Sequence, residues 1–168
     1  NIALMRQAQS VKKGVKFSGG TPREFCTITV TDGIAMGHEG MKSSLVSRDV
    51  IADSTELTVR GHCYDALVGV AGCDKSLPGL MMAMLRLNIP SVFIYGGSIL
   101  PGRYNGKDVT VLDVFEGVGK YSSGKMSEHA LRKLELKACP SAGACGGQFT
   151  ANTMACVSEA IGLALPYS

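Results

Sequence analysis

The sequence Gly72-Cys73-Asp74-Lys75 places a thiol, a carboxylate and an amine side by side, directly after the apolar run 66–71. Thiolates suit iron–sulfur clusters or zinc, whereas carboxylates suit magnesium or manganese. In open α/β sheets, ligands bind where the carboxyl ends of strands lead into helices. This turn is therefore predicted to be a binding site, at which Cys73 and Asp74 could serve two different metals.

Two further loops combine glycine with a side chain that could bind a metal. Asp32 precedes a glycine after a β-branched run, and Cys145 stands in Gly143-Ala144-Cys145-Gly146-Gly147. Because loops after successive parallel strands meet at one edge of a sheet, Asp32 is expected close to Cys73 and Asp74. Glycine also lets the backbone approach closely, so that exposed amides could hydrogen-bond cluster sulfur or a substrate carboxylate.

The elements that must position these residues follow from periodicity and turn signals. Helices are predicted at 2–15, 43–62, 78–87, 111–120, 127–137 and 150–164. Strands are predicted at 26–30, 65–71 and 91–95, with loops at 31–41 and, as the best surface loop, at 101–106. Apolar strands that alternate with helices predict a three-layer α/β/α fold with a largely parallel sheet, whose carboxyl ends carry the metal site.

Composition limits the class of protein. A chain of 168 residues with 45% hydrophobic and 18% charged residues predicts one compact α/β domain with a real core. A net charge of +3 is too small and too scattered to indicate nucleic-acid binding, and no apolar run is long enough to span a membrane. Its six cysteines, without an export signal or a C-x-x-C pair, indicate reduced thiols in the cytoplasm. The chain is expected to be part of a longer protein.

Simpler structural interpretations compete with these sites. Cys26, Cys63 and Cys156 are predicted to be small core residues, while Cys73 and Cys145 could be either core residues or ligands. The other candidate residues are predicted to have structural roles. Met81, Met82 and Met84 are predicted to fill the core. Loop or helix-end positions are predicted for His38, Glu39 and His62, and a solvated helix face for Arg132, Lys133 and Lys137.

Five blocks of sequence, at 32–41, 47–54, 72–79, 95–97 and 138–154, carry a resemblance to a known family. They resemble dihydroxy-acid dehydratase, of the family that also contains phosphogluconate and sugar-acid dehydratases. The blocks Gly37-His38-Glu39-Gly40-Met41 and Ile51-Ala52-Asp53-Ser54 favour the enzyme of branched-chain amino-acid biosynthesis over these relatives. The resemblance runs through essentially the whole chain.

The resemblance implies a role for each matched residue. Cys73 and Cys145 correspond to ligands of an iron–sulfur cluster, either [2Fe-2S] or [4Fe-4S]. Asp32 and Asp74 correspond to magnesium ligands, and Lys75 to a lysine whose carbamate binds Mg²⁺. The third cluster cysteine is expected just before residue 1, and a further carboxylate and the catalytic serine base in a C-terminal half. Residues 1–168 are accordingly expected to be most of the N-terminal domain of a two-domain homodimer, inactive when alone.

The implied function is dehydration of a 2,3-dihydroxy carboxylic acid, such as 2,3-dihydroxyisovalerate, to a 2-keto acid in valine and isoleucine biosynthesis. A small-molecule substrate is then the partner, with no nucleic acid and no membrane. Three alternatives stay open: a sugar-acid or phosphogluconate dehydratase, a non-catalytic anion-binding α/β module, and a thiol redox protein that uses Cys139 and Cys145.

Overall fold

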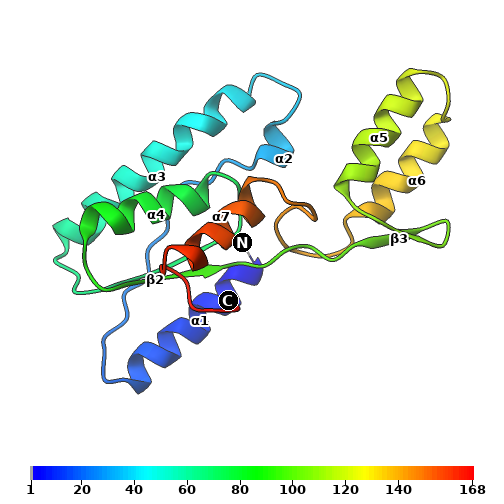
Figure 1. Ribbon diagram of the computed structural model, residues 1–168. Coiled ribbons are helices and arrows are strands. Elements are labelled where there is room, and N and C mark those ends of the chain that lie inside the picture. The colour runs from blue at the N-terminus through cyan, green and yellow to red at the C-terminus, as the bar shows by residue number, and fades with distance from the viewer. Residues whose placement is uncertain (1) are drawn as a thin grey trace.

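Helices make up about half of the protein, whose structure, a computed structural model, describes residues 2–168 (Figure 1). The helices are α1 (Ile2–Phe17), α2 (Asp32–Ala35), α3 (Met41–Gly61), α4 (Ser76–Leu87), α5 (Val111–Ser122), α6 (Glu128–Ala138) and α7 (Thr150–Ala160). The strands are β1 (Leu67–Ala71), β2 (Ser91–Tyr95), β3 (Gly102–Tyr104) and β4 (Lys107–Val109).

Strands β1 and β2 form a parallel pair that fixes where the reactive turn lies. Leu67 pairs with Ser91 at one end and Ala71 with Tyr95 at the other, and α4 is the crossover between the strands. Since the two strands end in register, the segments that follow Ala71 and Tyr95 emerge at the same edge. The Gly72–Lys75 turn is one of these segments.

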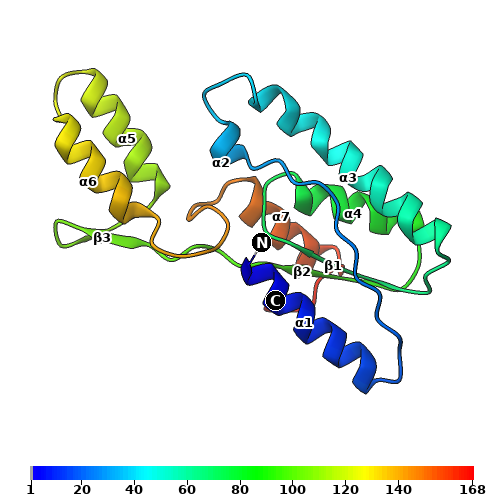
Figure 2. The same ribbon diagram turned by 180° about the vertical axis from the view of Figure 1, so that it is seen from behind.

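Helices lie on both sides of this strand pair (Figures 1 and 2). Helix α1 lies on one side, where Leu4 approaches Gly72 and Gly96 so closely that a side chain on Gly96 would overlap it. Helices α3, α4 and α7 lie on the other side. The main core forms there around the fully buried side chains of Ile51, Leu77 and Phe93.

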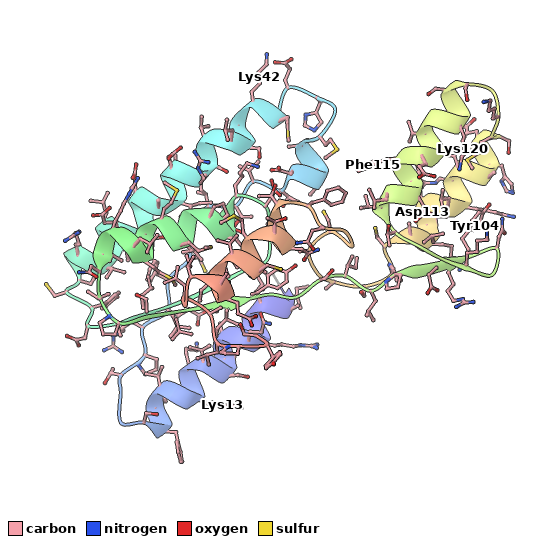
Figure 3. The ribbon with its side chains drawn as sticks, in the orientation of Figure 1. Lys13, Lys42, Tyr104, Asp113, Phe115 and Lys120 are labelled. Carbon is pink, nitrogen blue, oxygen red and sulfur yellow. The ribbon has the colours of Figure 1, made fainter. Side chains whose placement is uncertain are left out.

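Helices α5 and α6 and the β3–β4 hairpin form an arm beside the rest of the molecule, where Figure 3 labels Tyr104, Asp113 and Phe115. The arm has its own small core of Val109, Leu134 and Ala138. At the start of α5, Asp113 accepts a 2.7 Å hydrogen bond from the backbone N–H of Thr110, and the Thr110 hydroxyl accepts one from Leu112. This reciprocal cap satisfies backbone donors that the first turn of a helix leaves open.

Most predicted elements are confirmed, but four predictions are wrong. The predicted loop 31–41 contains the short helix α2 (Asp32–Ala35), and its last residue, Met41, begins α3. Residues 26–30 form no strand, because this segment finds no pairing strand and contacts α3 instead, with the hydroxyls of Thr27 and Ser54 2.6 Å apart. Residues 101–106 are not simply a loop: they contain β3, and Asn105 and Gly106 both have positive φ, as a type I′ hairpin turn requires. Helix α7 ends at Ala160 rather than at 164, where the chain instead bridges to Phe93.

A further correction concerns the cysteines predicted to be core residues. Cys26, Cys63 and Cys156 are all exposed, since each lies on a side of its segment that faces away from the core. None of the six cysteines, all within the described residues, forms a disulfide in the structure. Among the predicted core methionines, Met81 and Met84 are buried and Met82 is half-buried.

The prediction of a mixed α/β fold is confirmed. Within residues 2–168 the parallel sheet has only the two strands β1 and β2, and the other two strands are the antiparallel hairpin. The larger sheet of a three-layer fold therefore remains a prediction. No helix in the described part of the chain is both long and apolar enough to cross a membrane.

Gly79 allows α3 and α4 to approach closely, and its replacement provides a test of this packing. A Cβ at Gly79 would lie 2.8 Å from the carbonyl oxygen of Arg48 and 2.8 Å from Cγ2 of Ile51. In the full-length protein, Gly79→Ala is therefore expected to lower the free energy of unfolding by about 1–3 kcal/mol. Gly119→Ala is the matched control, because nothing lies within 4 Å of that position on exposed α5, and it is expected to stabilise the protein slightly. Equal thermal stability of Gly79→Ala and the wild type would contradict this account of the packing.

Candidate functional site

One ammonium group joins two carboxylates at the carboxyl end of β1. The Nζ atom of Lys75 lies 3.1 Å from Oδ2 of Asp32 and 2.5 Å from Oδ2 of Asp74. The side chains of the three residues are only 14–15% exposed. Two carboxylates this close to each other and this poorly hydrated need a positive charge between them.

The two halves of this group come from distant parts of the chain. Asp32 is the first residue of α2, and its second carboxylate oxygen accepts a hydrogen bond from the hydroxyl of Ser44, which is buried on α3. Asp74 and Lys75 lie in the turn from β1 to α4, where the carbonyl oxygen of Cys73 accepts hydrogen bonds from the hydroxyl and the backbone of Ser76. The first turn of α4 thus fixes the backbone that carries both side chains.

The electrostatics of the group follow from this crowding. Burial disfavours the ionised form of Asp32, but hydrogen bonds from Asp74, Ser44 and Lys75 outweigh burial and lower the pKa of Asp32. Burial and the nearby Asp32 raise the pKa of Asp74. For Lys75, hydrogen bonds to both carboxylates outweigh burial and raise the pKa of the ammonium. The charges therefore depend on one another, and an added cation would relieve the repulsion that raises the pKa of Asp74.

The two candidate thiols lie next to this group. Cys73 directly precedes Asp74 and is half-buried, with its Sγ 4.0 Å from the carbonyl oxygen of Val30. Cys145 is exposed as a residue, but partial burial of its thiol, together with the nearby Cys73, raises the pKa of Cys145. Both thiols are of the soft donor type that suits iron or zinc.

The loop before Cys145 is bound to the segment that follows β2. The N–H of Ala144 donates a 2.8 Å hydrogen bond to the carbonyl oxygen of Gly97, and the N–H of Ile99 donates one of 2.8 Å to Ala144. Gly143 makes this approach possible, because its φ is +148° and a Cβ would lie 2.4 Å from the backbone nitrogen of Ile99. Cys145 is thus held at the same sheet edge as Cys73.

These donors fit the two metals that the sequence suggests, but incompletely. Oxygen atoms of Asp32 and Asp74 suit a hard cation, and the thiols of Cys73 and Cys145 suit iron. Across residues 2–168, no three His, Cys, Asp or Glu side chains converge closely enough to hold a metal ion by themselves.

The structure brings together Asp32, Asp74 and Lys75 by direct contact and leaves Cys73 and Cys145 close by. Sequence reasoning missed the residues that support them, which are Ser44, Tyr95 and Asn152. A signal for Ser44 was present, since Ser44 and Ser47 recur at helical spacing and both are buried. Tyr95 and Asn152 lie in the blocks 95–97 and 138–154 that carry the resemblance, but no local pattern reveals their contact, which joins β2 and α7.

A family model and curated relatives show which family the chain belongs to. A family model described as "Dihydroxy-acid/6-phosphogluconate dehydratase N-terminal" matches residues 1–168. The chain is 89% identical over all 168 residues to a "Dihydroxy-acid dehydratase" of Pelagibacter ubique, of which it covers 29%. It is 60% identical over 164 residues, 98% of this chain, to a protein of the same name from Natronomonas pharaonis, of which it covers 28%.

The family model and the first relative therefore match the whole chain, while the chain spans less than a third of the length of these relatives. On the family model and these identities, the chain belongs to the dihydroxy-acid/6-phosphogluconate dehydratase family, whose N-terminal region it matches.

Proposed function

We propose that the full-length protein is a hydro-lyase that converts 2,3-dihydroxy carboxylic acids, such as 2,3-dihydroxyisovalerate, to 2-keto acids. The observation that carries this proposal is the contact of Lys75 with Asp32 and Asp74, directly beside the thiol of Cys73. It joins hard oxygen donors and a soft sulfur donor at one sheet edge. Relatives named dihydroxy-acid dehydratase support the choice of reaction.

The donor types suggest which metal each residue would hold. Mg²⁺ would be held by Asp32, Asp74 and Lys75. An iron–sulfur cluster would be held by Cys73 and Cys145, together with a third cysteine of the full-length protein that is expected just before residue 1. A carbamate on Lys75 would replace its positive charge with an oxygen-donor anion. That change would leave three anionic groups together, and so would make binding of a divalent cation necessary rather than optional.

The reaction removes a proton from C2 and hydroxide from C3, and the resulting enol becomes the 2-keto acid. When bound, the two metals would supply Lewis acidity for the departing hydroxyl and positive charge for the substrate carboxylate. Asp32 and Asp74 would supply the oxygen donors for the hard cation, and the Ser44 hydroxyl keeps Asp32 oriented. We do not assign any of these residues as the base that accepts the C2 proton. We propose that this base lies in the rest of the full-length protein.

Finer features of the full-length protein are part of the same proposal. We expect β1 and β2 to belong to a wider parallel sheet with helices on both faces, since helices already lie on both sides of the pair. Exposed apolar residues on α3, among them Leu57 at 72% exposure, support burial against further chain or a second copy. We propose that the full-length protein is a cytoplasmic homodimer that acts in valine and isoleucine biosynthesis. The six cysteines without disulfides are consistent with the cytoplasm. The mass of the full-length protein in solution tests the dimer.

The function is tested with the complete protein, expressed and purified without oxygen. We expect bound iron and sulfide together with dehydration of 2,3-dihydroxyisovalerate. Cys73→Ser should lose the cluster and the activity, because a hydroxyl is a poor ligand for iron. Cys26→Ser is the matched control and should keep both, since Cys26 is exposed and lies outside the site. The proposal would be contradicted by a wild-type protein without iron, or by a Cys73→Ser variant that keeps its full iron content and activity.

Asp74→Asn tests the oxygen-donor half of the site. The variant should keep its iron but bind Mg²⁺ more weakly and lose at least about 100-fold in kcat/KM, since even an outer partner of a metal ligand contributes 10–100-fold. Asp65→Asn changes an exposed carboxylate near the start of β1 and should leave activity unchanged. If Asp74→Asn binds Mg²⁺ with the same affinity as the wild type, the proposed role of Asp74 is wrong.

The carbamate on Lys75 is open to direct detection. Incubation of the full-length protein with ¹³C-bicarbonate and Mg²⁺ should give a carbamate carbon signal by NMR. Lys75→Arg should lack the signal, because a guanidinium cannot take up the carboxyl group but still pairs with carboxylates. A signal of equal size in both proteins would exclude Lys75 as the modified residue.

A further inference from the structure

The side-chain amide of Asn152 makes three hydrogen bonds around the Cys145 turn. Its Nδ2 donates to the carbonyl oxygen of Cys145 at 2.8 Å and to that of Gly147 at 2.5 Å. Its Oδ1 accepts a hydrogen bond from the hydroxyl of Tyr95. The two carbonyls can only accept, so the NH₂ group must face them and the amide has a single workable orientation.

Tyr95 stabilises this orientation of the amide, because its hydroxyl donates a hydrogen bond to Oδ1 of Asn152. It is the last residue of β2, so its position is fixed by the parallel strand pair. Burial, with a contribution from the nearby thiols of Cys145 and Cys156, raises the pKa of Tyr95 to about 12. The hydroxyl therefore remains a proton donor to Asn152 at physiological pH.

The contacts of Asn152 add to backbone hydrogen bonds within the turn, which run from the N–H of Gly147 to the carbonyl of Cys145 and from the N–H of Phe149 to that of Gly147, both at 2.8 Å. Its composition makes this added support useful. Gly146 and Gly147 follow Cys145, and glycine leaves the backbone free to take up many conformations. On one side the turn is held by Ala144, which is bonded to the segment after β2. On the other side, the Asn152 amide links the carbonyls at both ends of the Cys145–Gly147 segment to α7.

We propose that Asn152, oriented by Tyr95, is a positioning residue that holds Cys145 in the conformation required for binding the iron–sulfur cluster. This inference rests on the proposed role of Cys145 as a ligand. A metal site gains affinity when its ligands are held in place before binding, and loss of an outer partner typically costs 10–100-fold. Neither residue would contact substrate or the reacting atoms.

The test uses three variants of the full-length protein purified without oxygen. Asn152→Asp keeps size and shape but removes both donors, and Tyr95→Phe removes only the hydroxyl that orients the amide. Tyr104→Phe is the matched control, because its hydroxyl bonds to Ala130 on the α5–α6 arm (Figure 3). Iron and sulfide per chain, the rate of cluster loss in air by visible absorption, and thermal unfolding of the metal-free protein are measured for each.

Asn152→Asp is expected to lose its cluster about 10–100-fold faster than the wild type, and Tyr95→Phe by a smaller factor. Tyr104→Phe should match the wild type. Unchanged cluster content and lifetime in Tyr95→Phe and Asn152→Asp would overturn the inference, as would changes confined to the unfolding temperature. If Asn152→Asp does not fold, Tyr95→Phe alone decides by the same criteria. A wild type without iron would instead mean that the proposed function itself has failed.

Discussion

The site depends on one electrostatic constraint: two poorly hydrated carboxylates, Asp32 and Asp74, share a single ammonium. Without Lys75 between them, the repulsion of these groups would oppose the approach of α2 to the turn after β1. Removal of one partner from a buried ion pair is costly, because it leaves the other charge uncompensated. The same geometry explains how the site could exchange an internal cation for a metal. If Lys75 carries the proposed carbamate, a bound cation would have to replace the positive charge that its ammonium supplies.

The fold supplies this constraint through a small number of connections. Parallel pairing of β1 with β2 places the Gly72–Lys75 turn beside the segment that follows Tyr95. From that segment, Gly97 and Ile99 bind the backbone next to Cys145, while Tyr95 reaches the same turn through Asn152. Helix α3 adds the Ser44 hydroxyl to Asp32. Cys73 and Asp74 thus share one turn, while Asp32 and Cys145 reach the same sheet edge from other segments.

Sequence patterns predicted the parts of this structure that depend on local order. The β1–turn–α4 unit was recognisable because an apolar strand, a glycine and a helical repeat follow one another, and β2 was predicted with its observed bounds, Ser91–Tyr95. Residues 26–30 were misread because strand propensity does not reveal whether a partner strand exists. The hairpin at Asn105-Gly106 was missed although this pair is a strong turn signal. The Asn152 contacts could not be predicted, because they depend on how α7 approaches β2 in three dimensions.

The central claim is that Mg²⁺ at Asp32, Asp74 and Lys75 lies directly beside a cluster held by Cys73. Electron paramagnetic resonance of the reduced full-length protein tests it most directly, with paramagnetic Mn²⁺ in place of Mg²⁺. The account predicts that Mn²⁺ broadens the cluster signal and that Asp32→Ala abolishes the broadening while the cluster stays bound. A cluster signal that saturating Mn²⁺ leaves unchanged would contradict it.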